Sequence, residues 1–508
     1  MTPRSAGLLL HITSLPGPFG IGDLGPEAET FLDWAAAAGQ GIWQILPVHP
    51  TGGNDSPYGG VSAFAGNPLL LSPRRLVEDG LLSEGAQAEG PRFDSDRVDY
   101  ARVRRWKEGL LLRESWSQFQ RQGACAREEL EAFRAAPAQA PWLEDWILFA
   151  ALKERLGGRP WPLWPDGLAA REPKAIAAAR RNLAGEILFH AYVQFLFARQ
   201  WERLHASARA KGIALFGDVP IYVTHDSADV WAHPDLFALD AAGWPEMVAG
   251  VPPDYFSETG QLWGYPLYRW DAMEAEGFRW WIDRLRNCLS AVEIVRIDHF
   301  RGLAGYWAVP AGDRDARGGK WLKGPGEKLF DALRRELGSL PIVAEDLGII
   351  TEDVTELLTR LAIPGMKVLQ FAFFEEDSPH APHRHVVNSV VYPGTHDNDT
   401  ARGWFAGLTA EERRRVADYT GGDGSAIEWE LIRTAYTSVA ARAVVAAQDV
   451  FGLGSEARMN VPALAAGNWT WRARSEDFTR ERAARLHRLA ELTGRFPRQR
   501  VPASAPRV

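Results

Sequence analysis

The sequence predicts an α/β chain folded as a (β/α)8 (TIM) barrel. Eight short apolar segments recur along its 508 residues, and stretches with apolar residues at helical spacing separate them. Strands that alternate with helices form parallel sheets, and eight such units close into a barrel. Several of these apolar segments end abruptly in charged residues, and a barrel gathers its polar side chains at the carboxyl ends of its strands.

The predicted strands follow one another in chain order. They lie at residues 7–15, 41–48, 213–223, 291–300, 341–347, 366–373, 389–392 and 450–453. The segment 291–300 (AVEIVRIDHF) shows the pattern best, because β-branched residues run directly into Arg296 and Asp298. A helix is expected at 26–38 and another at about 476–492, where apolar residues recur every three or four positions.

Two long stretches exceed what one barrel helix requires. Residues 74–211 are mostly helical in pattern, so we expect a mainly helical insertion subdomain after the second strand. A second insertion, 224–268, follows the third strand and carries an aromatic-rich loop, GVPPDYFSETGQLWGYPLY. We expect these insertions to decorate a single barrel domain that spans residues 1–508.

Composition excludes several classes of protein. A net charge of -8 without a concentrated basic stripe argues against nucleic-acid binding. Only Cys125 and Cys288 are present, too few for a disulfide framework or a cysteine zinc site. No apolar stretch is long enough for a signal peptide or a membrane span, so we expect a cytoplasmic protein without a membrane partner. The sequence does not set the oligomeric state, and a monomer is the expectation. The 21 tryptophans suit a core, and they also suit a sugar-binding surface.

Three acidic residues close apolar runs. They are Asp298 in VRIDHF, Glu345 in VAEDLG and Asp397 in GTHDND. One such acid can be a structural ion pair or a helix cap, but three at strand ends of one barrel would converge on a shared cleft. No metal-ligand spacing and no glycine-rich phosphate loop accompanies them. The pattern favours carboxylate chemistry on an uncharged substrate, with neither metal nor cofactor.

Two carboxylates on either side of a glycosidic bond can cleave it, one as nucleophile and one as acid/base. Arg296 lies two residues before Asp298 on the same face of the strand, so it should keep Asp298 ionised. The charge of Asp298 should in turn raise the pKa of Glu345, as an acid requires. Asp397, with His299 and His396 as hydrogen-bond donors, would bind sugar hydroxyls. Retention predicts Asp298 and Glu345 carboxyls roughly 5 to 5.5 Å apart.

Seven motifs in order along the chain resemble those of the amylomaltases, or 4-α-glucanotransferases, of the α-amylase superfamily. They are GLLLHITSLPGPFGIGDLG, DSPYGGVSAFAGNP, GVPPDYFSETGQLWG, VRIDHFRG, VAEDLG, GTHDNDT and GLGSEARMN. The resemblance implies a retaining enzyme with Asp298 as nucleophile, Glu345 as acid/base and Asp397 as transition-state stabiliser. It implies glucan subsites lined by Ser56, Tyr58, Asp254, Gln261, Trp263, Arg296, His299, His396, Gly467 and Asn468. We add Asp218, embedded in the third strand, and the loop aromatics Tyr255 and Phe256.

Two departures from the family pattern concern substrate binding. Ala463 and Leu464 replace a small Gly-Thr pair near Gly467 and Asn468, and Gly53 and Asn54 stand where some relatives have an aromatic residue. Tyr100 in RVDY resembles the other half of a remote second glucan site. The presence of that site is left open.

The function expected from the resemblance is transfer of α-1,4-glucan segments to the 4-hydroxyl of an acceptor. Donors would be maltooligosaccharides or starch- and glycogen-type glucans, and acceptors would be glucans or glucose. If Tyr255, Phe256 and Trp263 cover the cleft, they would stack on an acceptor sugar and exclude water; alternatively they pack inside the insertion. An α-1,4-glucan hydrolase and a catalytically silent glucan-binding protein stay open as alternatives.

Overall fold

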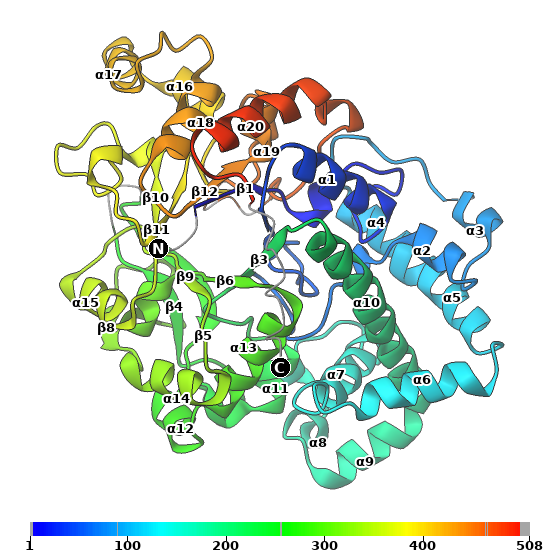
Figure 1. Ribbon diagram of the computed structural model, residues 1–508. Coiled ribbons are helices and arrows are strands. Elements are labelled where there is room, and N and C mark those ends of the chain that lie inside the picture. Colours follow the sequence, from blue (N-terminus) through cyan, green and yellow to red (C-terminus); the bar gives the residue numbers. More distant parts are fainter. Residues whose placement is uncertain (1–3, 89, 254–256, 463, 465, 498–508) are drawn as a thin grey trace, which may run out of the picture.

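A barrel of eight parallel strands forms the centre of the computed structural model, which describes residues 4–497 except 89, 254–256, 463 and 465 (Figure 1). Hydrogen-bonded neighbours follow the order β10-β11-β12-β1-β2-β3-β6-β9. At the seam between β9 and β10 the amide of Ala344 donates to the carbonyl of Pro364 at 2.9 Å, so the barrel is nearly closed. The strands are β1 (Ser5–Leu9), β2 (Ile42–Gln44), β3 (Ala214–Val219), β6 (Ile294–Ile297), β9 (Ile342–Ala344), β10 (Gly365–Val368), β11 (Ser389–Tyr392) and β12 (Arg442–Ala446).

The predicted barrel is confirmed, but the predicted eighth strand is wrong. Residues 450–453 belong to the end of α19 (Ala447–Phe451) and the turn after it, where Gly452 has a φ of +71° and ends the helix. The strand is β12, a few residues earlier, and its β-branched Val444 and Val445 are fully buried between β1 and β11. Both segments are short apolar runs, and only the pairing with β1 distinguishes them.

Amphipathic helices cover the outside of the barrel. In α1 (Pro26–Ala37) a proline opens the helix, Glu27 and Glu29 lie in the first turn near the positive end of the helix dipole, and Phe31 and Leu32 are buried. The others that follow barrel strands are α13 (Arg279–Ala291), α14 (Glu327–Leu337), α15 (Glu352–Leu361), α16 (Ala401–Gly407), α17 (Ala410–Thr420), α18 (Ile427–Thr437) and α20 (Arg480–Leu492). The expected helices at 26–38 and 476–492 are α1 and α20.

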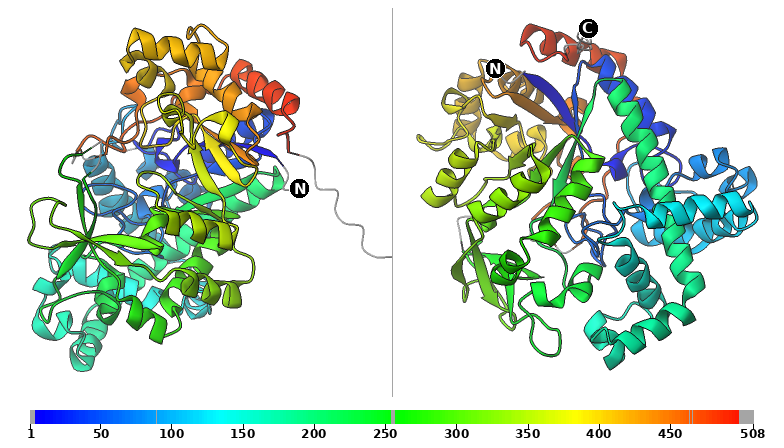
Figure 2. Two further views of the ribbon diagram at one scale, coloured as in Figure 1. Left: turned by 90° about the vertical axis from the view of Figure 1, so that its left-hand side faces the viewer. Right: turned by 60° about the horizontal axis from the view of Figure 1, so that its bottom comes forward.

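The segment between β2 and β3 is helical and gathers on one side of the barrel (Figure 2). Its longest element, α10 (Ala184–Ala210), packs against α7 (Leu143–Arg155) and against α1. The remaining helices are α2 (Pro73–Glu78), α3 (Glu84–Ala88), α4 (Tyr100–Trp106), α5 (Leu112–Phe119), α6 (Ala124–Ala135), α8 (Asp166–Ala169) and α9 (Pro173–Asn182). The division into a barrel and two insertion subdomains stays a prediction.

A small antiparallel sheet lies beside the barrel, and the sequence did not predict it. Its strand order is β5-β4-β7-β8, with β4 (Met247–Val251) and β5 (Gln261–Pro266) from the second insertion. Strands β7 (Gly305–Pro310) and β8 (Lys320–Lys323) come from the segment after β6. Short helices α11 (Ala228–Ala232) and α12 (Trp270–Ala275) flank the insertion strands in the chain. The second insertion is therefore joined to the segment that follows Asp298.

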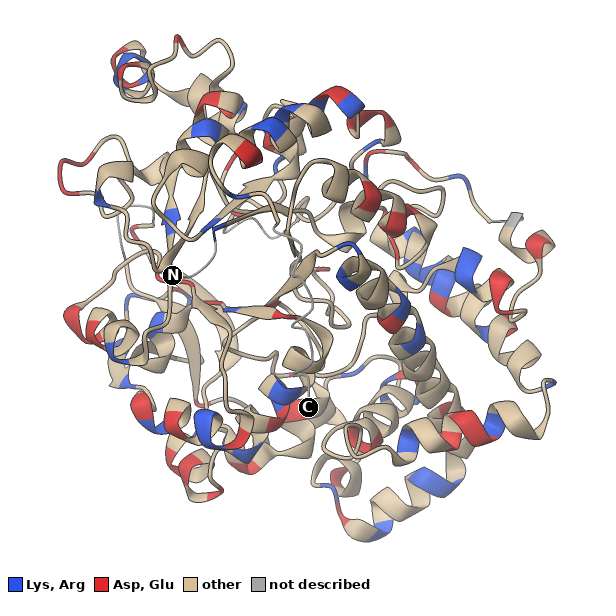
Figure 3. Cartoon of the chain, viewed as in Figure 1, with Lys and Arg blue, Asp and Glu red and all other residues tan. Residues whose placement is uncertain are grey.

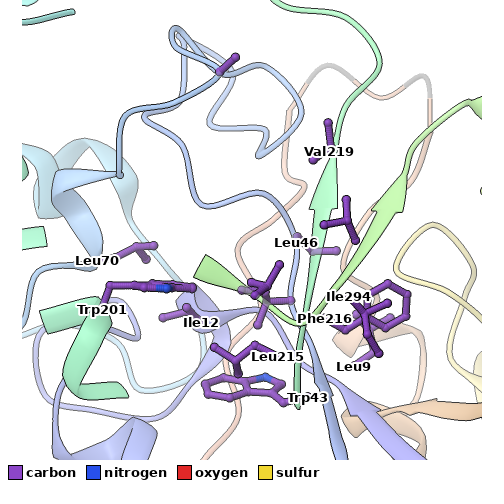
Figure 4. Packing of buried hydrophobic residues seen from close by; sticks show 14 of the residues in the cluster. Leu9, Ile12, Trp43, Leu46, Leu70, Trp201, Leu215, Phe216, Val219 and Ile294 are labelled. Carbon is purple, nitrogen blue, oxygen red and sulfur yellow. The ribbon is translucent and has the colours of Figure 1, made fainter. Parts of the chain in front are cut away.

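Large apolar side chains fill the space within the barrel and beneath its helices (Figure 4). Trp43 is fully buried on β2, and its indole N–H donates to the carbonyl of Leu10 at 2.8 Å. Acidic and basic residues are interspersed along the outer helices (Figure 3). No helix within the described residues is long and apolar enough to cross a membrane.

Arg495 ties the C-terminal segment to the amino end of the barrel. Arg495 is fully buried, and its guanidinium donates to main-chain carbonyls at the start of β1 and in the segment that leads from α18 into β12. The accepting residues are Ser5, Tyr436, Ser438, Ala440 and Ala441.

Candidate active site

The three predicted acids lie at the carboxyl end of the barrel. Asp298 and Glu345 each follow the last residue of their strands, β6 and β9, and Asp397 lies in the loop after β11. The carboxyl group of Glu345 accepts the amide of His299 at 2.7 Å and the amide of Leu347 at 2.8 Å. His299 is the residue directly after Asp298, so the Glu345 carboxyl is bonded to the backbone beside the proposed nucleophile.

Arg296 joins two carboxylates. Its Nη2 donates to Asp298 Oδ1 at 2.8 Å and its Nη1 donates to Asp218 Oδ2 at 2.5 Å. The Asp298 side chain is 26% exposed, whereas that of Asp218 is 0% exposed. Asp298 is therefore open to a substrate. Asp218 is closed off behind Arg296 in this structure, and its predicted contact with a sugar stays a prediction.

Tyr58 connects this ion pair to His396. The Tyr58 hydroxyl donates to Asp218 Oδ2 at 2.8 Å and lies 2.9 Å from His396 Nε2, and the two rings stack at 5.3 Å. Since the single hydroxyl proton goes to Asp218, we assign the proton between Tyr58 and His396 to Nε2. Burial lowers the pKa of His396, which favours the neutral ring that this assignment requires. His396 Nε2 also lies 3.3 Å from Asp397 Oδ2.

The loop that carries Ser56 and Tyr58 is shaped, as its residues predicted. A bridge between Thr51 and Gly60 closes it, and Ser56 Oγ accepts the amide of Tyr58 at 3.3 Å. Asp55 has a φ of +55° and accepts a hydrogen bond from Arg104 of α4 at 2.7 Å. The helical segment thus fixes the loop from outside the site.

Two residues that hold Asp397 were missed by the sequence reasoning. Asn460 Nδ2 donates to Asp397 Oδ1 at 2.6 Å, and Arg458 Nη2 donates to the Asp397 carbonyl at 2.7 Å. Both belong to the motif GLGSEARMN, which carried the family resemblance without a role being given to its residues. The Asp397 side chain is 44% exposed, which leaves its second oxygen accessible.

Burial sets the protonation of the two central acids. It raises the pKa of Glu345 to about 8; the charge of Arg296 lowers that pKa and the charge of Asp298 raises it. Burial also raises the pKa of Asp298 to about 6, outweighing Arg296. We had expected the charges of Arg296 and Asp298 to dominate. The two values still leave Asp298 mainly ionised and Glu345 mainly protonated at neutral pH.

Trp263 and Gln261 on β5 lie close to the nucleophile. The Trp263 ring meets the His299 ring edge to face at 4.7 Å, and its indole N–H donates to Gln261 Oε1 at 3.1 Å. Burial lowers the pKa of His299 to about 3, so this ring is neutral. The predicted residues Asp254, Tyr255 and Phe256, which precede this strand, lie outside the described residues, as does Ala463.

Asn468 uses its amide to close its own loop. Its Oδ1 accepts the amide of Val461 at 2.9 Å, and its Nδ2 donates to the carbonyls of Val461 and Leu464. Gly467 has a φ of +88°, which permits the turn there. Trp469 follows and packs against the rings of Tyr58 and His396. Asn468 thus shapes its own loop, and its predicted contact with a sugar stays a prediction.

Tyr100 and Asp346 are each hydrogen-bonded to the backbone of another segment. Tyr100 is 7% exposed and its hydroxyl donates to the carbonyl of Trp469 at 2.9 Å, so its ring offers no open surface for a second glucan. Asp346 accepts the amide of Met366 on β10, the structural role that strand alternation predicted.

Within the described part of the chain, no group of three or more His, Cys, Asp or Glu residues could hold a metal ion. A reaction without metal or cofactor stays a prediction.

Comparison with known proteins identifies the family. The profile of the 4-alpha-glucanotransferase family matches residues 10–477. The chain belongs to the 4-alpha-glucanotransferase family. It is 50% identical to the 4-alpha-glucanotransferase of Thermus thermophilus over 504 residues, which is 97% of this chain and 99% of that protein. It is 46% identical to the chloroplastic/amyloplastic 4-alpha-glucanotransferase of Solanum tuberosum, over 97% of this chain and 86% of that protein.

A solved structure agrees with this assignment. The amylomaltase of Streptococcus agalactiae in complex with acarbose superposes with a TM-score of 0.94 at 37% identity. The match covers 97% of this chain and 100% of that one. The 4-alpha-glucanotransferase family thus accounts for nearly the whole chain, insertions included.

Proposed function

We propose that this member of the family transfers α-1,4-glucan segments by a retaining double displacement on Asp298. Its activity is that of a 4-alpha-glucanotransferase, as the family shows. The observation that carries the mechanism is the position of Glu345, bonded to the backbone amide of the residue after Asp298, with a higher pKa than Asp298. One ionised and one protonated carboxyl at a shared site is what the first displacement needs.

In the first displacement, a carboxylate oxygen of Asp298 attacks the anomeric carbon of the donor glucan. The glycosidic bond breaks, and its oxygen takes the proton of Glu345 as the shortened glucan leaves. Arg296 fixes the orientation of Asp298 through the other carboxylate oxygen. The products are a glycosyl ester on Asp298, an ionised Glu345 and a shortened glucan whose new end carries a free 4-hydroxyl.

The second displacement uses the same acid as a base. Ester formation removes the charge of Asp298, which had raised the pKa of Glu345, so that pKa falls. The 4-hydroxyl of an acceptor glucan or glucose then gives its proton to Glu345 while its oxygen attacks the anomeric carbon. A new α-1,4 bond forms and Asp298 is released as a carboxylate.

Asp397 and the two histidines are placed to act on the sugar ring during both steps. Asn460 and Arg458 hold Asp397 by its side chain and its carbonyl, and the neutral His396 lies beside it. A carboxylate held in this way can accept hydrogen bonds from sugar hydroxyls and stabilise positive charge on the ring at the transition state. Asp218 and Tyr58 contribute by fixing Arg296 and His396.

The substrates we propose are maltooligosaccharides and starch- or glycogen-type glucans, with glucose or a glucan as acceptor. The acarbose complex of the Streptococcus agalactiae amylomaltase supports a site for this class of sugar. Trp263, packed on His299 beside Asp298, supports acceptor binding in place of water.

Maltotriose without any added cofactor tests the reaction. Longer maltooligosaccharides together with glucose are expected, whereas glucose and maltose alone would establish a hydrolase. The roles are tested with an α-glucosyl substrate that carries an activated leaving group and needs no proton. Glu345→Ala should then accumulate a glycosyl-enzyme detectable by mass spectrometry and Asp298→Ala should not; equal trapping by both variants would refute the assignment.

A further inference from the structure

We propose that Arg301 is a positioning residue for Glu345, acting through the loop that follows it. Arg301 lies in the short 3-10 helix Phe300–Leu303, three residues after Asp298. Its Nη1 donates to the carbonyl of Ile349, and its Nε donates to the carbonyl of Gly305 at 3.4 Å. The inference rests on the acid/base role proposed above for Glu345.

The burial of Arg301 is unusual for its surroundings. The residue is only 4% exposed, and no carboxylate among the described residues forms an ion pair with it. Burying an unpaired guanidinium is unfavourable unless its donors are satisfied. Here Nη1 and Nε donate to main-chain carbonyls, and the guanidinium carbon lies 3.9 Å from the ring centre of Trp321 on β8. The segment that follows β6 and the loop that follows β9 therefore meet at this side chain.

The Ile349 contact fixes the backbone that orients Glu345. Leu347 packs against the core, but Gly348 and Ile349 are exposed, so packing does little to hold the part of the loop that reaches Ile349. The amide of Leu347, at the start of this loop, is one of the two donors to the Glu345 carboxyl. The other donor, the amide of His299, belongs to the segment that carries Arg301. Arg301 therefore connects the loop that supplies the Leu347 amide to the segment that supplies the His299 amide.

Trp321 completes this clamp from the small sheet. Its ring is 42% exposed and packs edge to face against Trp307, its partner on β7. One face of the Trp321 indole covers the guanidinium of Arg301. This contact restricts the orientation of the guanidinium and contributes no charge of its own. Removing Trp321 should therefore loosen the clamp, and removing Arg301 should abolish it.

The consequence is a change in the proton affinity of Glu345. Each amide donor stabilises the ionised carboxylate, so loss of the Leu347 bond raises the pKa of Glu345. Arg296 of β6 and Asp298 directly after it face Glu345, while Lys367 of β10 faces Asp346 and Asp353 of α15 faces Arg301. All these groups stay in place in the variants below.

The alkaline limb of kcat/KM for maltotriose reports the pKa of Glu345, since the acid must be protonated in the free enzyme. For Arg301→Ala we expect this limb to move up by about 0.5 to 1 pH unit and kcat to fall about tenfold, with KM within about twofold. Trp321→Ala should move the limb in the same direction by less. Arg301→Lys should fall between wild type and Arg301→Ala, because an ammonium can donate to Ile349 but lacks the planar fork.

Trp244→Ala provides the matched control. Trp244 is 39% exposed on a turn of the second insertion and packs against His225, away from the clamp. The alkaline limb of kcat/KM for Trp244→Ala should coincide with that of wild type. If Arg301→Ala does not fold, Trp321→Ala and Arg301→Lys decide.

The proposal would be overturned if the alkaline limb of kcat/KM for Trp321→Ala coincided with that of wild type. This holds even if the limb of Arg301→Ala shifts, because loss of the arginine's charge alone would then explain that shift. An unmoved or lowered limb in Arg301→Ala would overturn it as well. Failure of the proposed mechanism is distinguishable: in that case Glu345→Gln would keep wild-type activity on maltotriose.

Discussion

Replacing Asn460 by alanine tests the idea that a fixed Asp397 is needed in the transition state. The change removes one hydrogen bond, from Asn460 Nδ2 to Asp397 Oδ1 at 2.6 Å. The backbone at this position stays held, since the amide of Asn460 donates to the carbonyl of His396 and its carbonyl accepts from Arg458. The substitution should therefore loosen the Asp397 carboxylate without changing the backbone of this segment.

A hydrogen bond to a charged group contributes about 1.5 to 3 kcal/mol. The Asp397 side chain is 44% exposed, so water can replace part of the lost bond and the lower value applies. A loss of about 1.4 kcal/mol in transition-state stabilisation is a tenfold loss of rate. We expect kcat for maltotriose to fall about tenfold, with KM within about twofold, because Asp397 is proposed to act mainly on the transition state.

Initial rates of glucose release from maltotriose measure both constants. Asn388→Ala is the control, because Asn388 is exposed and its amide donates only to the carbonyl of Ala362 at 3.1 Å. A kcat/KM for Asn460→Ala within twofold of wild type would refute the reasoning. A rise in KM with unchanged kcat would instead make Asp397 a ground-state binding group.

Three further outcomes are expected. The pH profile of kcat/KM should be bell-shaped, because Asp298 must be ionised and Glu345 protonated. Activity should fall below pH about 6 and above pH about 8, which are the apparent pKa values of the coupled pair. A profile that is flat from about pH 5 to 9 would contradict these roles. Trp263→Ala should raise the ratio of hydrolysis to transfer about threefold or more, which corresponds to a change of about 0.6 kcal/mol in the relative barriers of the two reactions. The ratio is measured as reducing ends formed against glucose released. An unchanged ratio would count against acceptor stacking. Arg495→Ala should lower the free energy of unfolding by on the order of 3 kcal/mol, because buried carbonyls lose their donor. Urea denaturation followed by circular dichroism measures this change, and Arg488→Ala, at an exposed residue, is the control. A loss below about 0.5 kcal/mol would show that water replaces the guanidinium.

The barrel and its three acids were predictable because the relevant signals are local. Asp298 and Glu345 follow buried strands directly, so strand alternation and the geometry of a parallel barrel place them together. The prediction of the eighth strand failed because residues 443–446 and 450–453 are both short apolar runs, and pairing with β1 decides between them. Local patterns also could not reveal that β7 and β8 pair with the second insertion, since antiparallel partners are chosen by tertiary contact.

The residues around the acids were harder to predict because their roles depend on burial. Asp218 lies in a strand, as the sequence suggested, but whether it meets a sugar or an arginine depends on which side chains lie in front of it. Asn460 reaches Asp397 across 63 positions of the chain, and no periodic pattern connects them. Motifs of unexplained polar residues, such as SEARMN, are the available signal for such contacts.

The order of the two catalytic pKa values follows from how the donors are divided between the acids. Burial raises the pKa of both carboxyls, so burial alone would not separate them. Arg296 gives its guanidinium directly to Asp298, whereas Glu345 receives only neutral amide donors from His299 and Leu347. A charged donor stabilises a carboxylate more than neutral donors do, so the first proton is lost from Asp298. The division of roles between nucleophile and acid is therefore built into the position of one arginine, two residues before the nucleophile on the same strand.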